Sequence, residues 1–194
     1  MPELVVFHSL LGLRPGVVAW ADRLRDAGFT VHTPDLYDGV YFETSPEAAA
    51  GIKHIGFDGV LDRAREAVEA LSSDLVYAGF SNGGACAELL AATRPGARGA
   101  ILMHAPLPIK PLDWADWPAS VPVQVHFNAR DPLRDAATVD GFAARVRQSG
   151  APYEEFLYDG QGHLFADRDL PQYNEANAQL MTERVLDFLR SLGN

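Results

Sequence analysis

Short, continuous apolar runs alternate with longer segments of helical periodicity along this chain of 194 residues. Leu4–Phe7 is wholly apolar, whereas the apolar residues between 61 and 71 recur at the spacing of one helix face. A strand without polar positions is buried on both sides, and a helix between two such strands allows them to pair in parallel. The pattern predicts an α/β fold, a mostly parallel sheet with helices on both faces, as a single domain over residues 1–194.

The same periodicities place the individual elements. The predicted strands are Leu4–Phe7, Phe29–His32, Leu75–Ala78, Ala100–Met103, Val123–Asn128 and the segment around Glu155–Tyr158. The predicted helices run from about Val17 to Ala27, around 61–71, from Asn82 to before Pro95, through Phe142 and Val146, and from about Gln172 to Leu192, where Leu180, Met181, Val185, Phe188 and Leu189 should face the sheet. Sites in such sheets lie beyond the carboxyl ends of the strands, so we expect function in the loops after each strand.

Charge and cysteine content exclude several function classes. Twenty-six acidic against sixteen basic residues give a formal net charge of -10, which argues against nucleic acid or an anionic membrane as a partner. The single cysteine, Cys86, cannot form an internal disulfide framework, and no histidines have metal-ligand spacing. No apolar run approaches the roughly 20 residues of a membrane span, and no basic segment precedes an apolar one at the start. We therefore expect a cytoplasmic protein without a metal or a membrane partner.

The segment Gly79–Gly83 matches G-x-S-x-G and directly follows a predicted strand. In a nucleophile elbow the serine occupies a sharp strand-to-helix turn, where side chains two residues to either side would collide. Ser81 is thus the predicted nucleophile, and the backbone N–H of Asn82 is a predicted donor to an oxyanion. The alternative is a glycine-rich turn with an incidental serine.

The acid and the base of such a site follow the serine in the chain, each after a later strand. Asp131 follows the strand ending at Asn128, and His163 follows the last strand in a glycine-containing loop. We predict that His163 takes the proton of Ser81 and that Asp131 fixes its tautomer. Asp159 is the rival acid, and Asp131 could instead belong to a plain Asp-Pro turn.

The remaining residues of chemical interest have structural interpretations. Asp35 is predicted to be a turn residue, and His126, inside a strand, a hydrogen-bonded core residue. Cys86 lies in the helix after Ser81 and is predicted to be a small core residue rather than a second nucleophile. The loop after the first strand, residues 8–12, should supply the second oxyanion donor, for which we choose the backbone N–H of Leu10.

With these motifs in order, the chain resembles the dienelactone hydrolase family over nearly its whole length. The resemblance rests on Leu4–Gly12, Pro34–Tyr37, the elbow, Asp131–Pro132, Gly162–Ala166 and Glu183–Leu189. It implies the α/β-hydrolase fold, here in a minimal form without a lid domain, and no cofactor. It also implies the roles of nucleophile, acid and base for Ser81, Asp131 and His163, and main-chain oxyanion donors at Leu10 and Asn82.

Three departures from the family pattern concern the substrate. Enzymes of this family that open dienelactone have a cysteine where this chain has Ser81, and a glutamate at the position of Ser9. They also have an arginine, which binds the substrate carboxylate, at the position of Asp167. We expect an acid there to repel an anionic lactone. Tyr37 and Trp114 are further candidates for the pocket, although the segment around Trp114 could equally be a surface crossover.

The sequence therefore predicts hydrolysis of a small ester, lactone or thioester through an acyl-enzyme on Ser81. Two alternatives remain open at this point. One is a ligand-binding or sensory protein that keeps the fold without turnover, since fold does not determine function. The other is acyl transfer or another hydrolysis by the same three residues.

Overall fold

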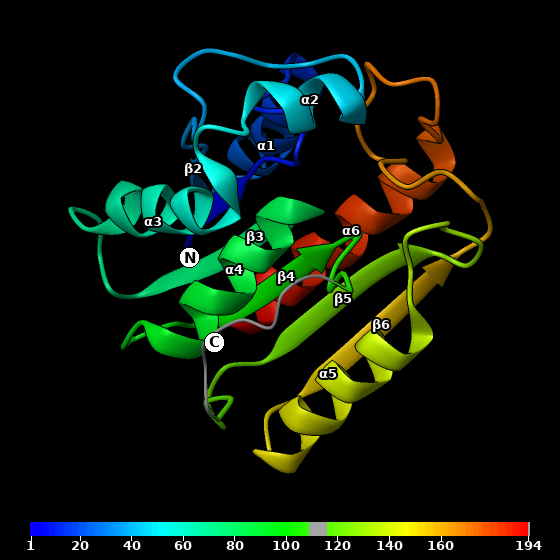
Figure 1. Ribbon diagram of the computed structural model, residues 1–194. Coiled ribbons are helices and arrows are strands. Elements are labelled where there is room, and N and C mark those ends of the chain that lie inside the picture. Colours follow the sequence, from blue (N-terminus) through cyan, green and yellow to red (C-terminus); the bar gives the residue numbers. More distant parts are fainter. Residues whose placement is uncertain (109–115, 194) are drawn as a thin grey trace.

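Six parallel strands form one sheet in the computed structural model, which describes residues 1–108 and 116–193 (Figure 1). The strand order is β2-β1-β3-β4-β5-β6. The strands are β1 (Glu3–Phe7), β2 (Thr30–His32), β3 (Leu75–Phe80), β4 (Gly99–Met103), β5 (Val123–Asn128) and β6 (Tyr153–Tyr158). Because all pairs are parallel, the loops that follow the strands meet at one edge of the sheet.

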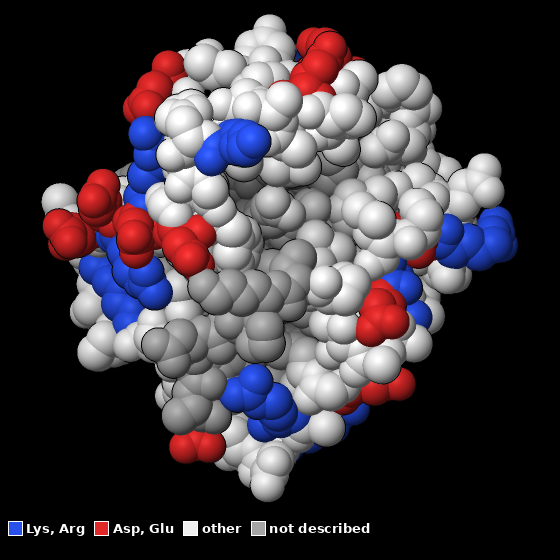
Figure 2. Space-filling model, in the orientation of Figure 1, with Lys and Arg blue, Asp and Glu red and all other residues white. Residues whose placement is uncertain are grey.

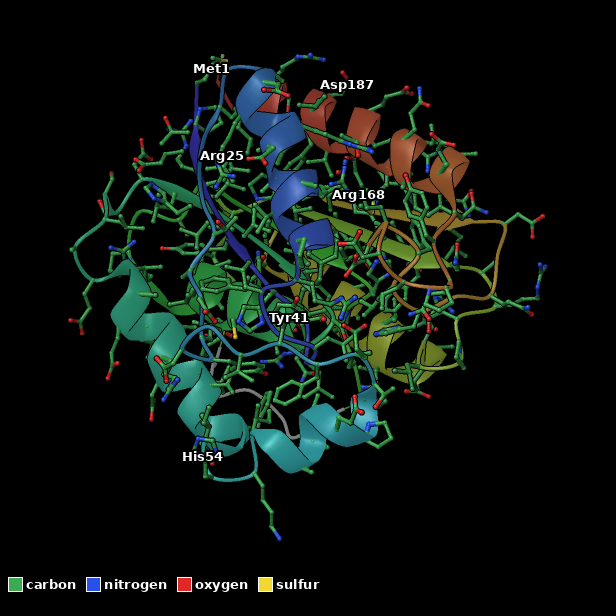
Figure 3. The ribbon with its side chains drawn as sticks, turned by 90° about the horizontal axis from the view of Figure 1, so that it is seen from above. Met1, Arg25, Tyr41, His54, Arg168 and Asp187 are labelled. Carbon is green, nitrogen blue, oxygen red and sulfur yellow. The ribbon has the colours of Figure 1, made fainter. Side chains whose placement is uncertain are left out.

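Helices cover both faces of this sheet, as the sequence predicted. The helices are α1 (Pro15–Asp26), α2 (Ser45–Gly51), α3 (Gly56–Val68), α4 (Asn82–Thr93), α5 (Ala136–Gln148) and α6 (Glu175–Ser191). Seen from above, α1 and α6 lie on one side of the strands, and α3 and α5 lie on the other (Figure 3). The predicted α/β class is confirmed, and the described residues contain no lid domain.

The core consists of two apolar layers separated by the sheet. Successive side chains of a strand point to opposite faces, so Leu4 and Val6 pack with α1 and α6, whereas Val5 and Phe7 pack with α3, α4 and α5. All six residues of β3 are buried. This two-sided burial explains why the strands near the middle of the sheet have uninterrupted apolar sequences.

Two elements differ from the prediction. The sequence patterns predicted no element for residues 45–51, where the structure has the short helix α2. This helix has a capping box in which Thr44 and Glu47 bond to each other's backbone N–H. The last helix begins at Glu175 rather than Gln172, because Asn174 accepts a hydrogen bond from the backbone N–H of Asn177 and caps it.

Leu180 of α6 was predicted to face the sheet, and this prediction is wrong. Its side chain is 41% exposed, whereas Met181, Val185 and Leu189 are fully buried. Residues one apart on a helix are separated by about 100°, so Leu180 and Met181 cannot both face the sheet squarely. Met181 occupies the centre of the apolar stripe and Leu180 lies at its solvent side.

The surface carries charges of both signs. On the face shown in Figure 2, acidic and basic side chains lie interspersed over α3, where Arg63 pairs with Asp38 and Arg65 with Asp62. Within the described part of the chain, every helix is too short or too polar to cross a bilayer.

We expect Met181→Ala to lower the free energy of unfolding by about 2–5 kcal/mol, because it removes a fully buried side chain and leaves a cavity. The neighbouring Leu180→Ala is the matched control and should change it by less than about 0.5 kcal/mol. Urea unfolding followed by circular dichroism measures both values. Similar losses in the two variants would contradict this assignment of the helix faces.

Candidate active site

Ser81 lies at the junction of β3 and α4, with the left-handed backbone angle φ of 53° that is rare for residues other than glycine. Two backbone hydrogen bonds hold this turn: Ser81 N–H donates to the Met103 carbonyl, and Gly84 N–H donates to the Ser81 carbonyl, both at 2.8 Å. The side chain stands at the N-terminus of α4, beyond the end of the strand. This is the geometry of a nucleophile elbow.

The two glycines of the motif are required by close backbone contacts. A Cβ atom at Gly79 would lie 2.0 Å from the Gly83 carbonyl oxygen. A Cβ atom at Gly83 would lie 2.4 Å from the carbonyl oxygens of both Phe7 and His8. The steric reason that the sequence suggested is therefore present, and the second contact also places the start of α4 against the loop after β1.

His163 and Asp131 lie beside Ser81, although 82 and 50 residues separate them from it in the chain. The Ser81 hydroxyl is 2.8 Å from Nε2 of His163, and Nδ1 of His163 is 2.8 and 3.0 Å from the two carboxylate oxygens of Asp131. An ionised carboxylate only accepts, so Nδ1 carries the proton and Nε2 is free to accept from the serine. The structure thus brings the three predicted residues into one hydrogen-bonded chain.

Burial and a backbone hydrogen bond hold the carboxylate of Asp131 in place. The Asp131 side chain is fully buried, and its Oδ1 also accepts a hydrogen bond from the Leu133 N–H at 2.9 Å. The His163 side chain is 12% exposed, so the imidazole is largely but not wholly removed from solvent. An oriented carboxylate in such a place favours the imidazolium that a general base must form.

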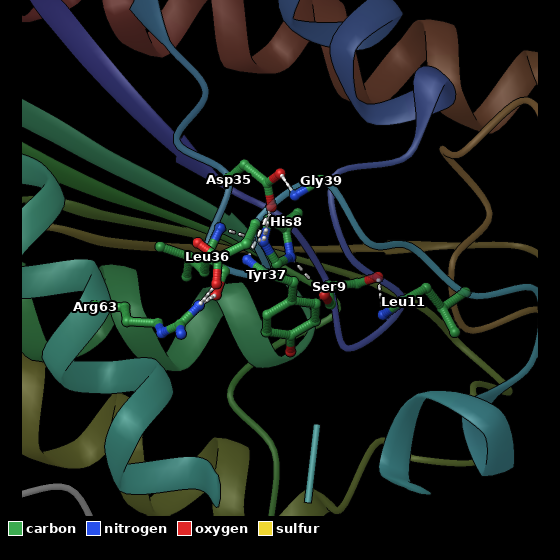
Figure 4. Close-up of polar contacts among 9 residues, drawn as sticks. His8, Ser9, Leu11, Asp35, Leu36, Tyr37, Gly39 and Arg63 are labelled. Atoms are coloured by element: carbon green, nitrogen blue, oxygen red, sulfur yellow. Dashed lines mark hydrogen bonds and ion pairs between the residues drawn. The ribbon is translucent and has the colours of Figure 1, made fainter. Parts of the chain in front are cut away.

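The rival acids have other surroundings. The Asp159 side chain is 89% exposed and pairs with Arg130 at 2.9 Å. Asp35 accepts hydrogen bonds from the backbone N–H groups of Tyr37 and Gly39, which makes it the turn residue that the sequence predicted (Figure 4).

Asn128, which sequence reasoning passed over, holds the histidine loop in place. Its side-chain amide donates to the Gly162 carbonyl at 2.7 Å, directly before His163, and its Oδ1 accepts from Asn177 of α6. A Cβ atom at Gly160 would lie 2.8 Å from Asn128 Oδ1, so the glycine permits a close approach. The available signal was a polar residue ending an otherwise buried strand.

The loop after β1 carries the predicted second oxyanion donor, Leu10, and begins at His8, whose carbonyl lies against the start of α4. Leu10 is half-buried, and the turn around it is held by the Ser9 hydroxyl, which accepts from Leu11 N–H at 3.2 Å. Asn82 opens α4, and the first N–H groups of a helix have no partner within the helix. The roles of the Asn82 and Leu10 N–H groups as oxyanion donors stay predictions.

His8 ties this loop to the segment after β2 (Figure 4). Its Nε2 accepts from Leu36 N–H at 3.0 Å, so Nδ1 carries the proton and donates to the Ser9 carbonyl. Burial lowers the pKa of His8, which agrees with a neutral ring. The Leu36 carbonyl in turn accepts from Arg63 of α3 at 2.8 Å. His8 therefore stabilises the conformation of the loop after β1.

Asp167, a predicted pocket residue, is buried beside Arg14. It is 2% exposed, and its Oδ2 lies 3.4 Å from Nε of Arg14, which is itself 3% exposed. Burial raises the pKa of the Asp167 carboxyl, while the Asp169 N–H and Arg14 act in the opposite direction. Arg14 thus lies against this carboxyl, and the expected repulsion of anionic substrates stays a prediction.

The other proposed pocket residues are less informative. Tyr37 is 4% exposed and packs edge-on against His8, with ring centroids 4.6 Å apart, within the core beside α3 and α4. Trp114 lies outside the described residues. Cys86 is fully buried, and burial raises the pKa of its thiol to about 12. Within residues 1–108 and 116–193 no group of three or more His, Cys, Asp or Glu side chains could hold a metal ion.

Comparison with solved structures shows that other proteins share this fold. The chain is similar to a dienelactone hydrolase-like promiscuous phosphotriesterase from metagenomic libraries, with 23% identity and a TM-score of 0.82 over 99% of this chain and 87% of that one. It is also similar to a phospholipase/carboxylesterase from Dyadobacter fermentans, with 16% identity, a TM-score of 0.66 and coverage of 95% and 90%. A carboxylesterase from Bacillus cereus is similar as well, with 18% identity and a TM-score of 0.57 over 95% of this chain and 87% of that one. These likenesses show the α/β-hydrolase fold.

Sequence comparison identifies the family. No curated protein matches the chain. A sequence model described as the dienelactone hydrolase family matches residues 1–193, which is nearly the whole chain. The parallel sheet, the elbow and the family match agree, and the chain belongs to the dienelactone hydrolase family.

Proposed function

We propose that this protein hydrolyses a small carboxylic ester or thioester through an acyl-enzyme on Ser81, with no cofactor. The observation that supports this most directly is the hydrogen-bonded chain from Ser81 through His163 to Asp131 at the carboxyl ends of the strands. The family and its structural neighbours are hydrolases, which is consistent with the proposal. The cytoplasmic location stays a prediction from the sequence.

In the first half of the proposed reaction, the Ser81 oxygen attacks the carbonyl carbon while its proton passes to Nε2 of His163. The N–H groups of Asn82 and Leu10 are the proposed donors to the oxyanion. The bond to the leaving group then breaks, and the alcohol or thiol departs with the proton from His163. In the second half, His163 takes a proton from water, which attacks the acyl carbon, and the acid and Ser81 are released.

Two alternatives use the same geometry. A phosphorus centre in place of the carbonyl is the stronger one, because a structural neighbour is described as a promiscuous phosphotriesterase. The second is a protein that only binds a ligand, which would not need a serine hydroxyl 2.8 Å from an imidazole nitrogen. A serine-directed phosphonate distinguishes an enzyme from a protein that only binds a ligand, because it reacts only with an activated serine.

Ser81→Ala should lower kcat/KM for p-nitrophenyl acetate by about a thousandfold or more, because no other group supplies the attacking oxygen. A fluorophosphonate should label the wild type at Ser81 and leave the variant unlabelled, as peptide mapping by mass spectrometry reports. A folded Ser81→Ala variant with wild-type turnover would refute the assignment. Turnover of a phosphotriester but of no carboxylic ester would favour the alternative reaction.

Asp131→Asn should lower kcat by about a thousandfold to ten-thousandfold, because an amide favours the wrong tautomer of His163. Asp159→Asn removes a carboxylate of the same kind from the exposed pair with Arg130 and is the matched control. Steady-state kinetics with both variants, after their melting temperatures show that they are folded, make the comparison. A large loss in the control alone would identify Asp159 as the acid.

Cys86 should not react with Ellman's reagent in the native protein at pH 8. With its pKa raised to about 12, only about one thiol in ten thousand is ionised there. One thiol per chain should be titrated after unfolding in guanidinium chloride, and Cys86→Ala should keep most of the activity. Rapid labelling of the folded protein with loss of turnover would make the thiol part of the site.

A further inference from the structure

His104 lies directly behind the proposed catalytic histidine. It follows the last residue of β4, Met103, and its side chain is completely buried. The centroid of its ring is 5.5 Å from that of His163, with the two planes tilted by 57°. The ring also packs against Phe80, which precedes Ser81, and edge-on against Phe165, which follows His163 by two residues. His104 therefore contacts the immediate surroundings of both the serine and the base.

Both ring nitrogens of His104 lack a hydrogen-bond partner among the residues that the structure describes. Such an arrangement is unfavourable for stability, because the nitrogens lose their bonds to water without gaining others. An apolar side chain would fill the space between the two phenylalanines without this cost. Unsatisfied buried polar groups are rare in folded proteins and call for an explanation.

The neighbouring His126 shows what a purely structural buried histidine looks like in this chain. Its Nε2 donates to Gln124 Oε1 at 2.9 Å, and its Nδ1 accepts from the Tyr158 hydroxyl at 2.8 Å. Both of its nitrogens are satisfied, whereas those of His104 are not. Of these two buried histidines, the one with unpaired ring nitrogens, His104, is the one that contacts His163.

His104 is uncharged in this environment. Its pKa is well below the ordinary value, chiefly because of burial and further because of the electrostatic interaction with His163 and His126. A neutral imidazole has one N–H and one lone pair, and hence a dipole. Since neither nitrogen is bound to a partner, the tautomer is free to place the lone pair nearer to His163.

We propose that His104 is a positioning residue that presents the negative end of its imidazole dipole to His163 and so stabilises the imidazolium formed there during catalysis. The interaction acts in a desolvated place, where a dipole acts on a charge more strongly than in water. It adds to the Asp131 carboxylate, which acts on the other side of the same ring through Nδ1. The inference rests on the proposed function, because it gives His163 the role of the base.

The charged and titratable groups around this pair are few, which makes the effect measurable. His163 faces Asp131 and Ser81 through its nitrogens and His104 through its ring. Among the described residues, His126 and, across Phe165, Tyr158 lie behind His104, and the Arg184 guanidinium lies 5.0 Å from the centre of the Tyr158 ring. Burial raises the pKa of Tyr158 to about 12 and lowers that of His126 to about 3, so neither changes charge at neutral pH.

The test compares wild type with His104→Phe, which keeps a ring of similar shape and removes the dipole. The protonation of His163 is followed by NMR of the imidazole nitrogens against pH, with the signals assigned by their absence in His163→Gln. We expect the midpoint of the His163 titration to fall by about half a pH unit, equivalent to about a threefold weaker stabilisation of the imidazolium. The plateau of kcat/KM should fall by a similar factor.

His126→Phe is the matched control. It should lower the melting temperature, because it removes the hydrogen bonds that His126 makes with Gln124 Oε1 and the Tyr158 hydroxyl, but it should not move the His163 midpoint. If His104→Phe does not fold, His104→Gln and His104→Leu form a second pair of similar size, of which the amide should keep the midpoint nearer to wild type.

An unchanged or raised midpoint in His104→Phe, or an equal shift in His126→Phe, would overturn the inference. The NMR titration needs no turnover, so it decides on His104 even if no ester is hydrolysed. Conversely, an active Ser81→Ala variant would remove the proposed function while leaving the measured coupling between the two rings intact.

Discussion

The close approach of α4 to the end of β1 sets the geometry on which the rest of this site depends. Gly83 packs directly on the carbonyl oxygens of Phe7 and His8, where no other side chain fits. The contact sets the start of α4 against the end of β1, next to Ser81, which has a left-handed backbone conformation. It also places the loop after β1 beside the serine, so one packing constraint positions the nucleophile and the candidate oxyanion donors together.

The buried polar groups around this junction differ in the partners that compensate for their loss of solvent. Asp131 is satisfied by His163 and by a backbone N–H, so its charge serves the orientation of one imidazole. Asp167 and Arg14 are buried as an opposed pair. His104 instead keeps two nitrogens without partners among the described residues. Buried polar groups that cost stability are tolerated more readily near a functional site, where the surrounding fold can hold them in place.

Family membership defines the chemistry more closely than the substrate. The structural neighbours at 16–23% identity include a promiscuous phosphotriesterase and carboxylesterases on the same sheet. Such a fold provides the elbow and the ends of parallel strands, while the loops decide what fits beside them. In this chain the loop after β2 is bound to the first loop through His8 and to α3 through Arg63. The two loops are therefore held by side chains from several elements.

The sequence by itself determined the order of the strands and of the helices other than α2. It also determined the elbow at Ser81 and the positions of Asp131 and His163, because each of these has a local signature next to a strand end. Only the tertiary structure decided which acid meets the imidazole and which lies on the surface with Arg130. It also decided that Arg14 opposes Asp167 and that His104 lies behind His163. These contacts join residues far apart in the chain, and the periodicity of a single segment carries no information about the partner that folding brings to it.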